Sequence, residues 1–339
     1  MAHLVNPLAS PAQLYNLKSS SQLPEDLQEV IFFTTQCLTQ AAGLLLELPQ
    51  STTAQASVLL ARYWLVDSPI MHEFSDASAA ALFIVSKMGP LPQSARDVAN
   101  VYAYLLSSQS PLLRSEKPAG GDPAEYYLTE SDYYAFQNRI LALEARILYA
   151  LSFNAHVSLP HPLAITYLQT LDFLGLGDKK DISARVVQHL NTALLSPQML
   201  YVTHQPHALA TAAIYCAARN VGAKMPESAW WEVFDVDREE LGFLVVGLMS
   251  VDNIMRKRRE DMPWMNEGAV TRSKVEAEMK QRGLRLGNGT KRGNNEEDEV
   301  MRMMDTVKGR FLSADGQAPA PFLMRLARQE STSIYAYAA

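Results

Sequence analysis

The stretch that decides the fold runs from Ala77 to Asn100, ASAAALFIVSKMGPLPQSARDVAN, and a weaker copy of it follows about 130 residues later. The copy runs from His207 to Glu232, HALATAAIYCAARNVGAKMPESAWWE. Each copy predicts three parts in order. The first is a helix of small residues that ends at a basic side chain, the second is a break that contains Gly and Pro, and the third is another helix with a polar cap. Ala alternating with larger apolar residues favours a central helix packed on several sides. The period is too long for a solenoid, so we expect two small α-helical domains in tandem.

Composition narrows the classes of protein that fit this chain. Of its 339 residues, 48% are hydrophobic and 19% are charged, which is typical of a globular protein. A net charge of −6 gives no diffuse basic field, so no direct nucleic-acid partner is expected. Cys37 and Cys216 lie in apolar helical stretches and should be buried, reduced thiols. No leader-like segment or stretch of about 18 uncharged apolar residues occurs, so we expect a protein that is neither secreted nor membrane-spanning.

The apolar periodicity predicts two sets of five helices and little β structure. Residues 1–24 lack periodicity and should be irregular, and residues 107–129 read as an insertion loop. The predicted helices are about 29–48, 53–66, 75–87, 93–106 and 131–151 in the first domain and about 161–174, 183–194, 206–220, 226–233 and 238–255 in the second. The predicted domains are residues 25–155 and 156–258.

The last 80 residues have a different character. A run of four basic residues, Arg256, Lys257, Arg258 and Arg259, opens a charged region that contains NGTKRGNNEEDE. We expect residues 259–339 to form a partly disordered tail, partly helical or extended, with helical islands at 275–281 and 297–311. The basic run is a candidate nuclear-localisation signal, or it ends the last helix with cations that its dipole favours.

Four stretches carry a resemblance to a known family. They are LTQAAGLLLELPQ (38–50), SK followed by RDVANVY (86–102), ALEARILYALSF (142–153) and PHPLAITYLQTL (160–171). In this order they resemble the L-type cyclins. The resemblance implies an all-α tandem cyclin-box fold and a regulatory subunit rather than an enzyme. It further implies a nuclear heterodimer with a cyclin-dependent kinase that acts in transcription by RNA polymerase II or in pre-mRNA processing.

The resemblance also implies a kinase-binding site. Lys87, at the end of the third helix, and Glu144, in the fifth, match the charged pair with which the family reaches the kinase near its C-helix. Met88, Leu148 and Phe153 match the apolar residues around that pair. From the residues alone, Glu144 could instead be a solvated carboxylate on a helix face, and Lys87 a cation favoured by the helix dipole. Arg139 and Arg146 have the wrong spacing to pair with Glu144 along the helix.

Two departures from the family pattern keep a second interpretation open. The family usually places acidic residues after the lysine, whereas this chain continues with Met88-Gly89-Pro90-Leu91-Pro92. The long Arg-Ser repeats that are common in L-type cyclins are missing. The alternative is therefore a cyclin-box adaptor of the TFIIB type, which binds transcription machinery without activating a kinase.

Other chemistry finds little support in the sequence, and neither a cofactor nor a metal is expected. The pairs His156/His161 and His204/His207 lack the further ligands that a transition metal needs, and His161 is expected to cap a helix instead. The segment 175–177, Gly-Leu-Gly, lacks the order of a phosphate-binding loop and reads as a turn. For Trp230-Trp231 we expect one ring in the core and the other at its edge.

Overall fold

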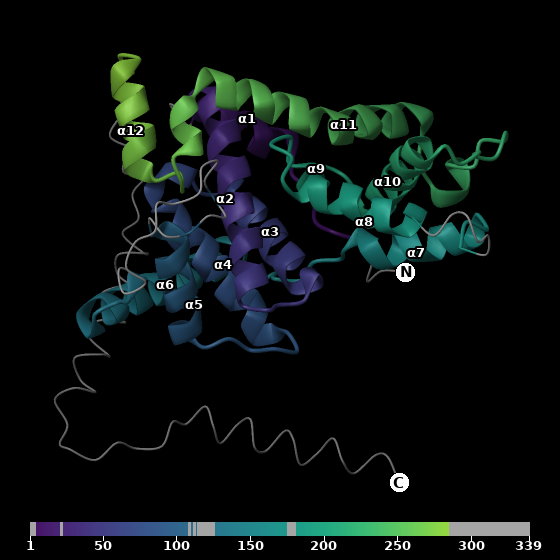
Figure 1. The fold of residues 1–339 in the computed structure, drawn as a ribbon. Helices are drawn as coiled ribbons and strands as arrows, with labels where there is room; N and C mark the ends of the chain where they lie inside the picture. Colours follow the sequence, from purple (N-terminus) through teal and green to yellow (C-terminus); the bar gives the residue numbers. More distant parts are fainter. Residues whose placement is uncertain are drawn as a thin grey trace, which may run out of the picture. The chain divides into compact units, whose positions relative to one another are not determined.

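The computed structural model describes residues 5–20, 23–107, 110, 113, 126–174 and 181–284, which are drawn as coloured ribbon in Figure 1. Regular secondary structure in these ranges is helical, and no strand occurs among them. The described residues belong to one compact unit. The all-α prediction is confirmed, while the expected turn at 175–177 and helical island at 297–311 lie outside the described residues.

The first five-helix set surrounds one buried helix. Helix α4 contacts α2, α3, α5 and α6, and its side chains from Phe74 to Ser86 are all buried. The alternation of Ala with larger apolar residues lets four neighbours approach it closely, as the sequence predicted. The set comprises α2 (Glu25–Leu45), α3 (Gln50–Trp64), α4 (Phe74–Met88), α5 (Ala95–Leu106) and α6 (Glu130–Ala150), with a short 3-10 turn, η2 (Pro69–Met71), before α4.

The second set repeats this plan around α10, which contacts α7, α8 and α11. One predicted helix, 226–233, is wrong: only a 3-10 turn, η5, forms there. The turn brings Trp230 and Phe234 into edge-to-face contact at 6.3 Å, and both rings are buried. Trp231 lies at the edge of this cluster, as expected. The elements are α7 (Pro160–Thr170), α8 (Asp181–Leu194), α9 (Leu200–Thr203), α10 (Pro206–Val221), η5 (Glu232–Phe234) and α11 (Arg238–Asp261).

The lead segment is more ordered than the sequence suggested. Helix α1 (Pro11–Ser20) forms within it, and a reciprocal cap explains its start. The Ser10 backbone N–H donates to Gln13 Oε1 at 2.9 Å, and the Gln13 N–H donates to Ser10 Oγ at 3.2 Å. Pro11 takes the first helical position, where a missing N–H does no harm. The expectation of an irregular segment over residues 1–24 is therefore wrong for its second half.

Asn6 anchors the lead segment to the rest of the chain. Its side chain is 3% exposed, donates from Nδ2 to the Ser158 carbonyl at 2.8 Å and accepts the Ser158 N–H at 2.8 Å. Its backbone exchanges two more hydrogen bonds with the Gln205 side chain. Ser158 belongs to the connection between α6 and α7, and Gln205 precedes α10. The lead segment thus joins this connection to the second helical set.

The beginning of the expected tail is also folded. Helix α11 runs to Asp261 and is followed by a 3-10 turn, η6 (Pro263–Asn266), and by α12 (Arg272–Gln281). Val275 and Met279 of α12 are fully buried, and α12 confirms the helical island predicted at 275–281. Arg282 binds Asp26 of α2 at 2.5 Å. Residues 259–284 therefore pack on the first set, and the predicted boundary of the tail at 259 falls inside α11.

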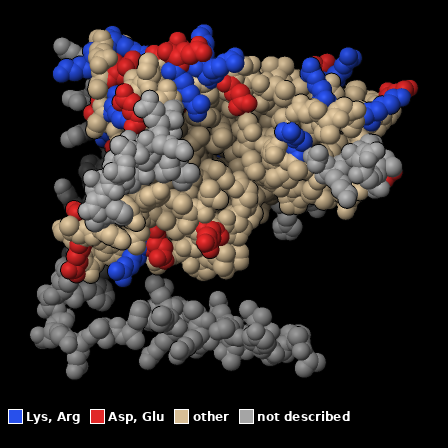
Figure 2. All heavy atoms as spheres, viewed as in Figure 1, with Lys and Arg blue, Asp and Glu red and all other residues tan. Residues whose placement is uncertain are grey.

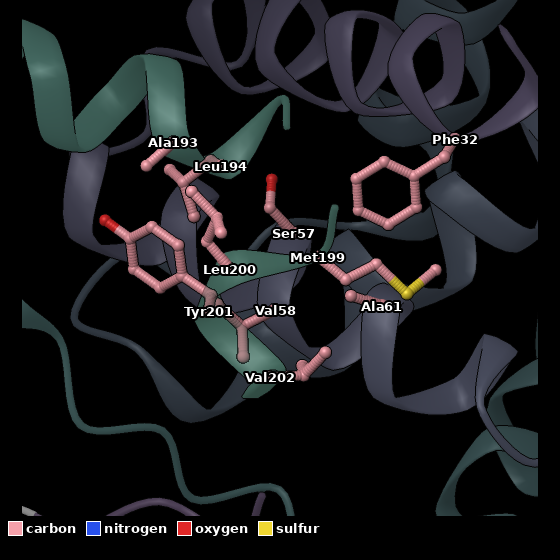
Figure 3. A pocket seen from close by; sticks show the side chains of 10 residues that line it. All are labelled: Phe32, Ser57, Val58, Ala61, Ala193, Leu194, Met199, Leu200, Tyr201 and Val202. Atoms are coloured by element: carbon pink, nitrogen blue, oxygen red, sulfur yellow. The ribbon is translucent and has the colours of Figure 1, made fainter. Parts of the chain in front are cut away.

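The two helical sets meet across a mainly apolar contact with a polar edge. Figure 3 shows a pocket there of about 10 Å³, room for roughly one water molecule, between Phe32 of α2 and Met199 before α9. At the polar edge, Asn191 Oδ1 accepts hydrogen bonds from Gln50 and from His161 Nε2, each at 3.1 Å. The expectation that His161 caps α7 is wrong, because its ring bonds to α8 instead.

Candidate functional site

Helix α6 carries the candidate site on its exposed side. Thr129 caps its start by accepting the Asp132 N–H, and one face of the helix is buried through Phe136, Ile140, Leu143 and Ile147. Leu141, Glu144 and Leu148 follow at steps of three and four residues, so they lie together along one flank of the buried face. Because the buried side chains fix the rotation of α6 against its neighbours, they also fix which of its side chains lie at the surface.

Lys87 and Glu144 form an ion pair across the contact between α4 and α6. The Lys87 ammonium also lies 4.3 Å from the centre of the Phe83 ring. The lysine side chain is 39% exposed and the glutamate 16%. Glu144 is therefore not the freely solvated carboxylate considered above, and Lys87 does more than complement the helix dipole. The structure therefore brings together Lys87 and Glu144, the two residues that match the family's charged pair.

Two further ion pairs fasten α6 next to the site. Arg139 binds Asp76, at the start of α4, and Arg146 binds Asp67, after α3, each at 2.7 Å. Neither arginine pairs with Glu144, as its spacing indicated. Tyr63 also donates to Asp67 at 2.8 Å, and burial, followed by the charge of Asp67, raises the pKa of this tyrosine. Helix α6 is thus fixed to its neighbours on both sides of Glu144.

Exposed apolar side chains follow the ion pair at the ends of α4 and α6. Met88, directly after Lys87, is 60% exposed and Phe153 is 71% exposed; Leu148 is half-buried. Phe153 has a φ of 60°, and Ser152 before it a φ of 50°. A bulky residue in this left-handed region is an outlier, and such strain tends to occur at functional positions. Leu141, three residues before Glu144, is 43% exposed.

The exit from α4 extends the same surface. Gly89 ends the helix with a φ of −87°, so its backbone is open to any residue. Leu91 beyond it is 49% exposed, and Pro90 and Pro92 stiffen the segment. This exit is therefore apolar and uncharged.

The basic run of α11 is partly engaged in the fold. Arg258 binds Glu29 at 2.8 Å, and the Arg259 guanidinium lies 5.9 Å from the Phe33 ring. Arg256 and Lys257 are exposed. On the face drawn in Figure 2, basic and acidic side chains are interspersed along the upper edge, where α11 and α12 run. No field of a single sign covers that edge.

Two histidines and both cysteines outside the site take part in hydrogen bonding, ring stacking or packing. His156 bonds to Ser158, and His204 stacks on Phe243 with 5.4 Å between ring centres. Burial raises the pKa of both free thiols, Cys37 and Cys216, to about 12. Among the described ranges, no group of three or more His, Cys, Asp or Glu could hold a metal ion, and no described helix is long and apolar enough to cross a membrane. The site therefore presents a paired charge and exposed apolar side chains to a partner.

Comparisons with known proteins give a consistent picture. No family model matches the chain. It is 33% identical to an uncharacterised cyclin-L1-like protein of Schizosaccharomyces pombe over 241 residues, which cover 71% of this chain and 88% of that protein. It is 30% identical to human cyclin-L2 over 74% of this chain, and 29% identical to chicken cyclin-L1 over 68%. The matches cover 45% and 41% of those two proteins, so the chain spans less than half their length.

Two solved structures share the fold. A chain of the Chaetomium thermophilum CAK complex bound to ATP-γ-S aligns over 93% of this chain and 94% of that one, with a TM-score of 0.54 and 16% identity. A chain of the yeast RNA polymerase II CTD kinase CTDK-1 complex aligns over 85% of this chain and 93% of that one, with a TM-score of 0.55 and 14% identity. At these identities the likeness concerns the fold, which is the predicted tandem cyclin box.

Proposed function

The chain belongs to the L-type cyclins, regulatory subunits of kinases that are not enzymes themselves, and we propose that it binds and activates a cyclin-dependent kinase acting in transcription or pre-mRNA processing. The proposed docking surface is formed by the end of α4 and the exposed face of α6. Its residues are Lys87, Met88, Glu144, Leu148 and Phe153.

One observation carries this proposal: an ion pair joins two packed helices, and exposed apolar side chains follow it at the ends of both helices. Lys87 and Glu144 are already joined to each other, so a partner that covers them need not supply two opposite charges. Met88 and Phe153 expose apolar surface that docking would remove from water. A preformed surface of this kind favours binding, because little ordering is required when the partner arrives.

The surface would act on the kinase through position alone. A protein kinase is active when the Lys–Glu ion pair to its C-helix and its metal-binding Asp are both in place. The docking surface would hold that helix inward, while the buried face of α6 and its pairs with Asp67 and Asp76 keep α6 fixed against its neighbours. The chain itself supplies no catalytic group in this scheme.

The test is the affinity of the full chain for the kinase that copurifies with it from its native cells. Replacing Glu144 with alanine should weaken binding by at least about 2 kcal/mol, roughly 30-fold, since truncating one partner of a pair that docking buries costs about 2–5 kcal/mol. Glu227→Ala is the matched control, because Glu227 also pairs with a lysine, Lys224, but on a fully exposed surface of the second box. It should leave the affinity unchanged.

Two outcomes would contradict the proposal. Unchanged affinity in Glu144→Ala, with the fold intact by circular dichroism, would remove this interface. Recovery of transcription proteins without any kinase would favour the adaptor of the TFIIB type. This alternative rests on the segment after Lys87, which lacks the acidic residues that the family usually places there. A kinase assay on a Ser-Pro-rich polymerase tail peptide, run on the copurified complex, tests the proposed role in transcription.

A nuclear location is part of the same proposal. Arg256 and Lys257 are exposed on the last turns of α11, whereas Arg258 and Arg259 contact the first box. Changing Arg256 and Lys257 to alanine in a fluorescent fusion should shift the protein towards the cytoplasm without unfolding it. If the variant protein stays in the nucleus, Arg256 and Lys257 are not required for nuclear localisation.

A further inference from the structure

Helix α11 leaves an apolar stripe uncovered on the second box. Phe243 is 55% exposed, Val246 68% and Met249 44%, while Leu244 and Leu248 between them are buried in the core. Three large apolar residues on successive turns of one helix face form a patch rather than scattered exposure. Among the described residues, only the His204 ring is recorded stacking on the stripe, against Phe243.

An exposed glycine lies at one end of the stripe. Gly242 is in the second turn of α11, and a Cβ added there would meet nothing within 4 Å. Packing inside the chain therefore does not require glycine, although an exposed helical glycine costs about 1 kcal/mol relative to alanine. Glycine on a helix surface permits the close approach of another backbone. This observation points to an external partner on the same face as Val246.

The exposed face has the spacing of a two-stranded helical seam. Its positions follow at steps of 3, 4, 3, 4 and 3 residues, as apolar seams between paired helices do. The order of these steps is the same from either end, so the seam can pair with itself. The seam positions are Glu239, Gly242, Val246, Met249, Asn253 and Arg256.

The charges on the seam select one orientation. We propose that α11 is a self-association surface, where a second copy of this chain docks with its own α11 antiparallel across a two-fold axis. In this pairing Val246 faces Met249 of the other copy, and Glu239 faces its Arg256. A parallel pairing would place each charge against its like, which destabilises neighbouring helices. Asp252 flanks the seam and does not lie on it.

The size of the stripe sets the strength of the proposed dimer. A stable interface buries about 1,200–2,000 Å² in total, more than three side chains such as Val246 can supply from each copy. Association should therefore be weak, with a dissociation constant on the order of 10–100 µM. The surface lies on the second box, away from Lys87 and Glu144 in the sequence, so the inference does not rest on the proposed kinase docking.

The test is sedimentation equilibrium of the full chain over a concentration series. The apparent mass should rise from the 37.6 kDa of one chain towards twice that value. Val246→Glu should weaken dimerisation at least tenfold, because it places like charges near the axis. Val233→Glu is the matched control, since Val233 is 73% exposed on η5 and lies off the seam. It should dimerise as the unchanged chain does.

A charge exchange tests the antiparallel orientation itself. Glu239→Arg and Arg256→Glu should each weaken the dimer, and the double variant should restore it, because both contacts recur across the two-fold axis. A chain that stays monomeric throughout the series would overturn the proposal. The stripe would then be a surface for binding a different protein. A dimer that persists in Val246→Glu would place the interface elsewhere and overturn it as well.

Discussion

Replacing Asn6 with alanine should lower the free energy of unfolding by about 2–4 kcal/mol. The amide joins both backbone groups of Ser158, each at 2.8 Å, and is 3% exposed. Alanine would leave the Ser158 N–H and C=O buried without these partners, and each such group costs about 1–3 kcal/mol. A water molecule that enters the vacated space would offset part of this loss, so we expect the lower half of the summed range.

The assay is urea unfolding followed by circular dichroism, with the loss read from the midpoint at an unchanged slope. Asn154→Ala is the control, because Asn154 is an exposed asparagine in the same connection as Ser158, and it should change stability by less than about 0.5 kcal/mol. Asn6→Asp should not rescue stability, since a carboxylate oxygen would replace the amide that donates to Ser158. If Asn6→Ala matched the control, the lead segment would not fasten the boxes and the reasoning would fail.

Three further predictions concern titration, reactivity and strain. Burial lowers the pKa of His161, so the fold favours its neutral ring; the stabilisation is present above the unfolded value of about 6.5 and is lost as the pH falls below it. The urea midpoint should therefore drop between pH 7.5 and 5.5, and less so in His161→Gln. Because burial raises the pKa of Cys37 and Cys216 to about 12, a thiol reagent at pH 8 should label the buried Cys216 only after unfolding, and the half-buried Cys37 far more slowly in the folded chain than in the unfolded one. Phe153→Gly should relieve the left-handed backbone, stabilising the chain by about 0.5–1 kcal/mol, while weakening kinase binding; a loss of stability would contradict this account.

Most helices could be predicted from the sequence because apolar residues recur along them at helical spacing and mark their buried faces. The small residues of α4 and α10 predicted two central helices, and both are buried. Helix α1 was missed because its signal is a cap, formed by Ser10 and Gln13, rather than an apolar period. The segment before η5 was predicted helical because Trp230 and Trp231 are apolar, yet the aromatic packing of Trp230 on Phe234 is satisfied by a shorter turn.

The candidate site could be predicted in its members but not in its geometry. Lys87 and Glu144 are 57 positions apart, and their pairing depends on how α4 and α6 pack. The exposure of Phe153 follows from two successive left-handed residues, for which its sequence, without glycine or asparagine there, gives no signal. The bonds of Asn6 to Ser158 span 152 positions, and an isolated asparagine in an aperiodic segment offers no pattern to detect.

The two boxes share a plan but differ where the proposed function needs them to. In the first box α4 ends at Met88, and Lys87 in its last turn pairs with Glu144 on the fifth helix. In the second, α10 ends near Arg219, and no ion pair joins α10 to α11 among the residues that the structure describes. The second box instead exposes an apolar stripe around Val246. A repeated fold therefore presents a charged pair followed by exposed apolar residues on one copy and an apolar stripe on the other. Glu144→Ala and Val246→Glu should consequently separate the two activities, each weakening one kind of binding and leaving the other unchanged.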